Sequence, residues 1–94
     1  MKFLVIEDDD DLREAIVDFL ATRRHYVTAC GSIAEADLAL SDFSPGVDAP
    51  DAIVSHIHLD DGDGVSFYIK ASSRFPDMRW ILTSPAPEQM RIWR

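Results

Sequence analysis

The chain of 94 residues, with a mass of 10.6 kDa, has the length of one small domain over 1–94, and its 47% hydrophobic and 28% charged residues exclude a disordered protein. Seventeen acidic residues against nine basic ones leave a formal net charge of −8, which disfavours nucleic-acid binding because that binding depends on clustered Lys and Arg. No apolar run reaches the length of a membrane span or a signal peptide, and the one cysteine cannot form an internal disulfide, so we expect a cytoplasmic protein without membrane contact.

The first third of the chain carries a strand pattern followed by a helix pattern. Residues 2–6 form a continuous apolar run, which is typical of a strand buried on both faces. Apolar residues then recur three and four positions apart, which predicts an amphipathic helix over 10–24 that Asp9 or Asp10 can cap. The positions in this helical stripe are Leu12, Ala15, Ile16, Phe19 and Leu20.

The middle of the chain repeats the alternation. A β-prone run at 26–30 ends at Gly31, and Cys30 within it has the character of a small buried residue. Ser32 and Glu35 have the spacing of a capping box, so we expect a second helix to begin there and to stop before the Ser-Pro-Gly sequence that follows it.

The last part of the chain completes the pattern. Residues 51–56 predict a third strand, 58–64 a loop, and 65–73 a third helix. Residues 79–83 predict a fourth strand, and 88–94 are expected to form one or two helical turns.

Strands separated by single helices predict a parallel sheet with right-handed crossovers. In such sheets the functional crevice lies at the carboxyl ends of the strands. Several chemically active side chains fall at or just beyond those ends: Glu7, Asp8, His56, His58, Thr83 and Ser84. We therefore expect them to converge on one edge of the sheet.

The sequence resembles the receiver domain of response regulators over essentially its whole length. The resemblance is carried by three blocks: the strand and acidic pair at 3–9, the strand and Asp-Gly loop at 50–64, and the strand ending in a hydroxyl residue at 80–84. It implies a flavodoxin-like α/β fold with three layers, a parallel sheet of order 2-1-3-4, and a role in bacterial two-component signalling. The implied partners are a histidine kinase, a phosphotransfer protein or another response regulator.

Two departures from the family limit what the resemblance implies. Where receivers end their third strand with the Asp that accepts the phosphoryl group, this sequence has His56. The family's last strand, with its Lys, and its last helix have no counterpart before Arg94, so the domain is short relative to the family. We expect this truncation to leave the strand at 79–83 as an open edge and apolar surface uncovered, and so to favour a dimer, an exchange of elements, or a partner that covers this surface.

The resemblance also implies roles for other residues. Glu7 and Asp8 match the pair that holds Mg²⁺ in receivers, although acids in this run can also simply cap the first helix. Thr83 matches the switch hydroxyl, but a Thr at a strand end needs no such role.

Three interpretations of His56 remain open. In the first, the protein is an atypical receiver without phosphoacceptor chemistry, in which His56 can pair with a nearby carboxylate and mimic a bound cation. In the second, His56 and His58 join Glu7 and Asp8 as two nitrogen and two oxygen ligands for Zn²⁺, Ni²⁺ or Cu²⁺. In the third, a neighbouring residue such as Asp60 still accepts phosphate. No catalytic residue is assigned under any of them, because the sequence holds no enzyme triad or nucleotide loop, and we do not expect an enzyme.

Overall fold

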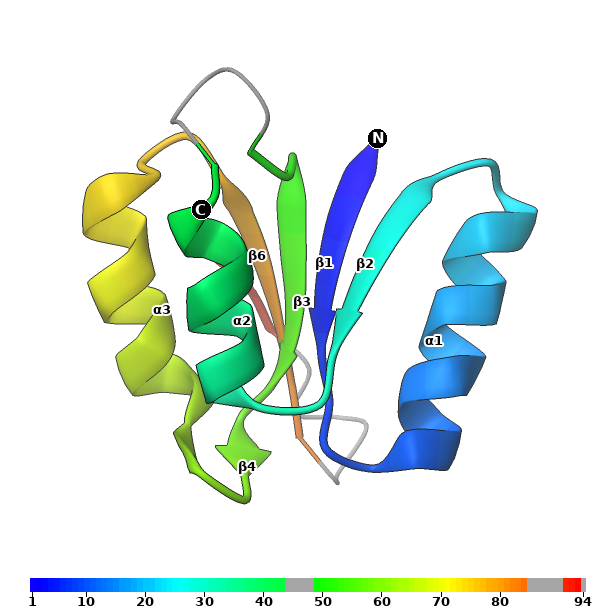
Figure 1. Cartoon of the computed structure of the whole chain (residues 1–94), viewed down its shortest axis with the longest axis horizontal. Coiled ribbons are helices and arrows are strands. Elements are labelled where there is room, and N and C mark those ends of the chain that lie inside the picture. Colours follow the sequence, from blue (N-terminus) through cyan, green and yellow to red (C-terminus); the bar gives the residue numbers. More distant parts are fainter. Residues whose placement is uncertain (44–48, 85–90, 94) are drawn as a thin grey trace.

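The protein is described by a computed structural model, which covers residues 1–43, 49–84 and 91–93. Its elements in chain order are β1 (Lys2–Ile6), α1 (Asp10–Thr22), β2 (Tyr26–Cys30), α2 (Ile33–Ser41), β3 (Ala52–His56), β4 (His58–Leu59), β5 (Gly62–Asp63), α3 (Gly64–Arg74), β6 (Arg79–Thr83) and β7 (Arg91–Trp93). The main sheet has the order β2-β1-β3-β6-β7, and β4 pairs with β5 in a separate two-stranded ribbon. The sheet lies between two helical layers, with α2 and α3 on one side and α1 on the other (Figure 1).

The parallel part of the sheet confirms the predicted α/β fold with strand order 2-1-3-4. β1 pairs in parallel with β2 and β3, and β3 pairs in parallel with β6. The registers bring the strand ends together, because Ile6 is opposite both Cys30 and Ser55, and His56 is opposite Thr83. The carboxyl ends of four strands therefore meet at one edge, which positions the candidate site.

Two unequal cores lie on the two faces of the sheet. Side chains alternate between faces along a strand, so Leu4 and Ile6 face α2 and α3, whereas Val5 faces α1. Among the described residues, the cluster under α2 and α3 contains thirteen buried side chains, with Trp80 fully buried. In the same part of the chain, the cluster under α1 contains three buried side chains, those of Val5, Leu20 and Val54. Most of the hydrophobic stabilisation therefore comes from the side that carries two helices.

The apolar stripe of α1 is only partly used. Leu20 is buried and Ile16 packs against the smaller core, but Leu12 and Phe19 are 45% and 54% exposed. One helix covers less of a sheet face than two do, so part of the stripe stays exposed, and the guanidinium of Arg23 lies over the Phe19 ring at 4.0 Å. None of the helices in the described ranges, α1 included, has the length and apolarity of a membrane span.

The first helix ends earlier than its sequence pattern predicts. It was expected to run to Arg24, but it stops at Thr22, and Arg24 adopts a left-handed backbone with φ 65°. That conformation turns the chain, and the N–H of His25 donates to the carbonyl of Leu20 at 3.2 Å. The usual signal for such an end is Gly or Asn. Neither is present here, so the boundary was not visible in the sequence.

The chain's final segment corrects two expectations. Residues 91–93 form the strand β7 rather than helical turns, and 88–90 and 94 lie outside the described residues. β7 pairs antiparallel with β6, with Ile81 opposite Ile92. The sheet thus has a fifth strand, although not a parallel one. Since β7 pairs with the backbone of β6, the expectation that β6 forms an open edge is wrong, and self-association cannot be argued from it.

Candidate functional site at the carboxyl ends of the strands

Glu7 is a buried carboxylate at the end of β1. Its residue is 2% exposed, its Oε2 accepts the N–H of Asp9 at 3.1 Å, and its backbone carbonyl accepts Arg13 Nη1 at 2.9 Å. Burial raises the pKa of Glu7 above its ordinary value, while the Asp9 N–H and the charge of His56 partly oppose that rise. A buried carboxylate of this kind needs a positively charged or hydrogen-bonding neighbour.

That neighbour is His56, at the end of β3. Its Nδ1 lies 3.0 Å from Oε1 of Glu7, and its side chain is 13% exposed. The two atoms are close enough for an ion pair when the imidazole is protonated, but they are not aligned as a hydrogen bond. Within the described residues neither atom has another hydrogen-bond partner. The Glu7 carboxylate is therefore compensated by His56 at Oε1 and by the Asp9 N–H at Oε2.

Asp8 contacts the loop that follows β3. Its Oδ2 accepts the backbone N–H of Asp60 at 2.8 Å. Slight burial by itself raises the pKa of Asp8, but the Asp60 N–H and other hydrogen bonds lower that pKa below its usual value. Asp8 is thus held ionised and joins the first strand end to the β4–β5 ribbon.

Thr83 lies beside His56 in the sheet. The two residues are partners in the β3–β6 register, so their side chains project from the same face. The hydroxyl of Thr83 donates to the carbonyl of Ser55 at 3.5 Å, and the Thr83 carbonyl accepts the N–H of Ile57 at 2.7 Å. The predicted switch residue is therefore at the site, with its hydroxyl directed to backbone.

The four proposed transition-metal ligands do not form one cluster. His58 is exposed and belongs to β4, where it is opposite Asp63. In the described part of the chain, no three or more His, Cys, Asp or Glu side chains are grouped so that they could hold a metal ion. The structure brings Glu7 and His56 together and leaves His58 outside.

The residues at the site also fit Mg²⁺ poorly. Mg²⁺ requires octahedral coordination by oxygen at about 2.0–2.1 Å. Of the carboxylate oxygens, Glu7 Oε1 faces an imidazole nitrogen, Glu7 Oε2 accepts the Asp9 N–H, and Asp8 Oδ2 accepts the Asp60 N–H. His56 adds a nitrogen atom beside these oxygens, whereas Mg²⁺ binds through oxygen. The donor set therefore does not match this ion.

Two residues that shape the site, Asp61 and Gly64, were given no role by sequence reasoning. The carboxylate of Asp61 accepts the N–H groups of Ile33 and Ala34, both at 3.0 Å, and these hydrogen bonds lower the pKa of Asp61. Gly64 passes so close to β3 that an added Cβ would lie 2.3 Å from the His56 carbonyl oxygen. The Asp61 contact spans 27–28 positions and has no local pattern. For the close approach of Gly64 to β3, the repeated Asp-Gly sequence at 61–64 was the available signal.

Cys30 lies at the end of β2 and is buried, as its sequence context predicts. Burial raises the pKa of its thiol to about 11, with the nearby charge of Glu35 adding to the rise. A thiol with this pKa remains protonated near neutral pH, so Cys30 packs in the larger core as a small apolar group.

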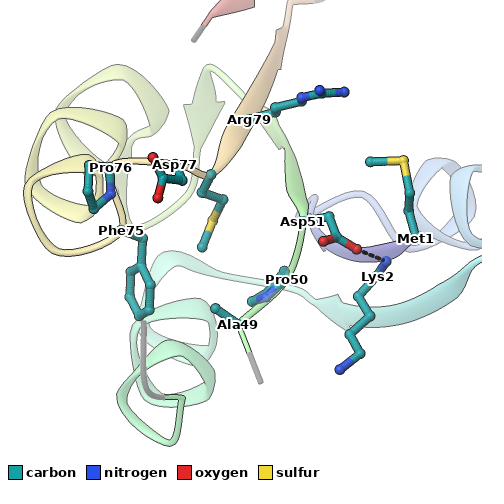
Figure 2. A pocket seen from close by; sticks show the side chains of 10 residues that line it. Met1, Lys2, Ala49, Pro50, Asp51, Phe75, Pro76, Asp77 and Arg79 are labelled. Carbon is teal, nitrogen blue, oxygen red and sulfur yellow. Dashed lines mark hydrogen bonds between the residues drawn. The ribbon is translucent and has the colours of Figure 1, made fainter. Parts of the chain in front are cut away.

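A hollow of about 570 Å³ lies at the opposite edge of the sheet, at the amino ends of β1, β3 and β6 (Figure 2). Lys2, Asp51, Asp77 and Arg79 supply its charged groups, and the Asp51 carboxylate accepts the backbone N–H of Lys2 at 2.7 Å. The charges are of both signs and the remaining lining is apolar. This hollow shares no residue with the Glu7–His56 pair.

Comparison with solved structures identifies the architecture. The receiver domain of HemR from Leptospira biflexa superposes with a TM-score of 0.77 at 24% identity, over 88% of this chain and 63% of that one. A response regulator receiver domain from Clostridium thermocellum gives a TM-score of 0.79 at 18% identity, over 88% and 64%. The response regulator TrrA from Thermotoga maritima, in complex with Mg²⁺-BeF, gives 0.80 at 16% identity, over 93% and 71%.

The chain has the receiver-domain fold. Strand order, parallel registers and the position of the helices all agree with that assignment. The chain spans just under two-thirds of the length of the HemR and Clostridium receivers, at 63% and 64%. No protein-family model and no curated protein matches the sequence. Within the receiver fold, Glu7 and His56 lie at adjoining strand ends on the edge where the acidic site was expected.

Proposed function

We propose that the chain is an atypical receiver module that acts by protein–protein interaction in two-component signalling, without phosphoacceptor chemistry at the end of β3. One observation carries the proposal: His56 Nδ1 lies 3.0 Å from Glu7 Oε1, where the resemblance to receivers expects an acceptor Asp beside an acidic pair. An imidazole cannot form the acyl phosphate that a carboxylate forms.

The Glu7–His56 pair gives a physical reason why the site can keep one conformation without a bound cation or phosphoryl group. When protonated, the imidazole brings a positive charge to the buried Glu7 carboxylate, as a bound cation would. The hydroxyl of Thr83 is directed to the Ser55 carbonyl, and it needs no phosphoryl group as a partner.

The other two interpretations have weaker support. Asp60, the candidate for a shifted acceptor, is exposed in the turn between β4 and β5, and its backbone N–H donates to Asp8. The transition-metal interpretation requires His58 beside Glu7 and Asp8, and no such group is found among the described residues.

The proposed partners follow from the fold and from the lack of assigned catalytic residues. We expect a non-enzymatic cytoplasmic module that binds a histidine kinase, a phosphotransfer protein, another response regulator or a second copy of itself. Surface recognition, rather than phosphoryl transfer at this site, would then carry the signal.

The test is exposure of the purified protein to acetyl phosphate and Mg²⁺, followed by intact mass spectrometry. We expect no mass gain of one phosphoryl group. A gain would overturn the proposal, and its absence in the Asp60→Asn variant would identify Asp60 as the acceptor.

A second measurement tests the alignment of His56 with the acceptor position. His56→Asp puts a third carboxylate beside Glu7 and Asp8, and we expect its affinity for Mg²⁺, measured by titration calorimetry, to exceed that of the native protein by about tenfold or more. The matched control is His58→Asp, which adds the same group at an exposed position of strand β4. Equal gains in both variants would contradict the alignment.

A further inference from the structure

We propose that β2 is a self-pairing edge, at which two copies of the chain join antiparallel about a two-fold axis at Thr28. β2 is the outer strand of the sheet, with β1 on one side and no described strand on the other. Natural sheets blunt such edges with Lys, Pro or a bulge. β2 has the sequence Tyr-Val-Thr-Ala-Cys and keeps an unbroken five-residue register with β1, so it carries none of these.

Only part of the backbone of β2 has N–H and C=O groups that point away from β1. Tyr26 donates its N–H to Met1, and Cys30 accepts the N–H of Glu7, so alternate residues of β2 face β1. Alternation then leaves the N–H and C=O groups of Val27 and Ala29 on the outer side.

The next outward N–H group at each end already has a partner. The N–H of His25 donates to the carbonyl of Leu20 at 3.2 Å, and the N–H of Gly31 donates to Oε2 of Glu35 at 2.6 Å. The open edge is therefore two residues long and bounded at both ends.

A second copy satisfies these groups in one arrangement. With Thr28 opposite its own copy, Val27 of each chain lies opposite Ala29 of the other, and each opposed pair exchanges two N–H···O hydrogen bonds. Tyr26, which is 78% exposed, then lies opposite the Cys30 end of the neighbouring strand.

Charge at the two ends of β2 favours this antiparallel orientation. Arg23 and Arg24 precede the strand and are exposed. Around its far end, the carboxylates of Glu7, Asp10 and Glu35 outnumber the one base beside them, Arg13. A two-fold axis places the basic end of one strand beside the acidic end of the other. A parallel arrangement would bring like charges together. The pairing is independent of the role proposed for His56.

The experiment uses opposite charges at the proposed axis. Thr28→Glu and Thr28→Lys each place two like charges directly opposite each other, which destabilises a strand pair. We expect the native chain to show a monomer–dimer equilibrium by sedimentation between about 1 µM and 1 mM. Each variant should have a dissociation constant raised by about tenfold or more, and an equimolar mixture should restore the dimer.

Controls separate this edge from other surfaces. Ser73→Glu and Ser73→Lys make the same changes on the exposed part of α3, and they should leave the dimer unchanged. In the native chain, hydrogen exchange at the Val27 and Ala29 amides should slow as concentration rises. A native protein that stays monomeric throughout, a dimer that both Thr28 variants retain, or a mixture that fails to restore it would each overturn the proposal.

Discussion

At the scale of single residues, the site is defined by which atoms the strand ends bring together. Glu7 and His56 come from β1 and β3, and their Oε1 and Nδ1 atoms lie 3.0 Å apart at positions separated by 49 residues in the chain. Burial raises the pKa of Glu7, so the group beside its carboxylate decides how well the ionised form is stabilised. A carboxylate oxygen in place of His56 Nδ1 would add negative charge beside Glu7, and the site would then favour a bound cation.

Gly64 is the residue whose substitution we expect to damage this edge most. A Cβ there would lie 2.3 Å from the His56 carbonyl oxygen and 3.2 Å from Ile57 Cα, and backbone cannot move aside without displacing the end of β3. We expect Gly64→Ala to lower the free energy of unfolding by about 3 kcal/mol, measured by urea denaturation.

The matched control for that substitution is Gly31→Ala. Its added Cβ would meet the ends of two flexible side chains, Glu35 at 2.9 Å and Arg13 at 3.2 Å. We expect a loss below about 1 kcal/mol. Equal losses in the two variants would show that the close approach of Gly64 to β3 is not what limits this position.

At the scale of elements, α2 shows how a helix start connects distant parts of the fold. Ser32 caps the helix, since its hydroxyl accepts the N–H of Glu35 at 3.1 Å. Asp61 accepts the N–H groups of the first two helical residues, Ile33 and Ala34. In a capping box the Glu35 carboxylate would accept the N–H of Ser32. Here it accepts the N–H of Gly31, one residue earlier in the chain. The loop after β3 is thereby attached to α2.

Removal of the cap should be measurable. We expect Ser32→Ala to reduce the free energy of unfolding by about 1 kcal/mol, because the N–H of Glu35 loses its acceptor. Urea denaturation of the variant and of Ser41→Ala, a serine at the other end of the same helix, provides the comparison. A larger loss for Ser41→Ala would contradict the capping role.

Asp61 should make the stability of this junction depend on pH. Its pKa in the folded protein is lowered from the ordinary 3.8 by the N–H groups of Ile33 and Ala34. The stabilisation is therefore present above that ordinary value and is lost as pH falls through the lower folded value.

We expect Asp61→Asn to be less stable than the native protein at neutral pH. This difference should shrink between about pH 4 and pH 2, as followed by urea denaturation. A difference that stays constant across this range would show that the ionised carboxylate is not what binds Ile33 and Ala34.

At the scale of the whole molecule, the sheet is covered unequally. α2 and α3 enclose the larger core, while α1 alone covers the smaller one, and Leu12 and Phe19 remain about half exposed. The acidic residues also gather at one edge of the molecule, since Glu7, Asp8 and Asp60 follow strand ends there. Most of the buried apolar contacts thus lie on one face of the sheet, whereas these acidic residues lie at the edge formed by the strand ends.

Neighbouring residues of β6 test the unequal cover. Leu82 is fully buried under α2 and α3, whereas Ile81 faces α1 and is only partly buried. We expect Leu82→Ala to cost about 3–4 kcal/mol of unfolding free energy and Ile81→Ala about 1 kcal/mol. Similar costs in urea denaturation would mean that the face under α1 is covered as well as the other.

The sequence by itself determined the order of the three helices and the four parallel strands, whereas β4, β5 and β7 lie where it predicted a loop and helical turns. Continuous apolar runs, helical spacing and the Ser32 capping signal are local, so they predicted β1, β2 and β6 to the residue and the start of α2. They also identified the edge that carries Glu7 and His56, because parallel strands align their carboxyl ends.

Tertiary structure alone decided the rest. The Glu7–His56 contact, the Asp61 cap on α2 and the antiparallel pairing of β7 with β6 join segments whose separation leaves no periodic trace in the sequence. The exposure of Phe19 likewise depends on how many helices cover a face, and not on the spacing within α1. Local patterns specify which residues are able to make a contact, whereas the packed fold selects the partner and the burial of each.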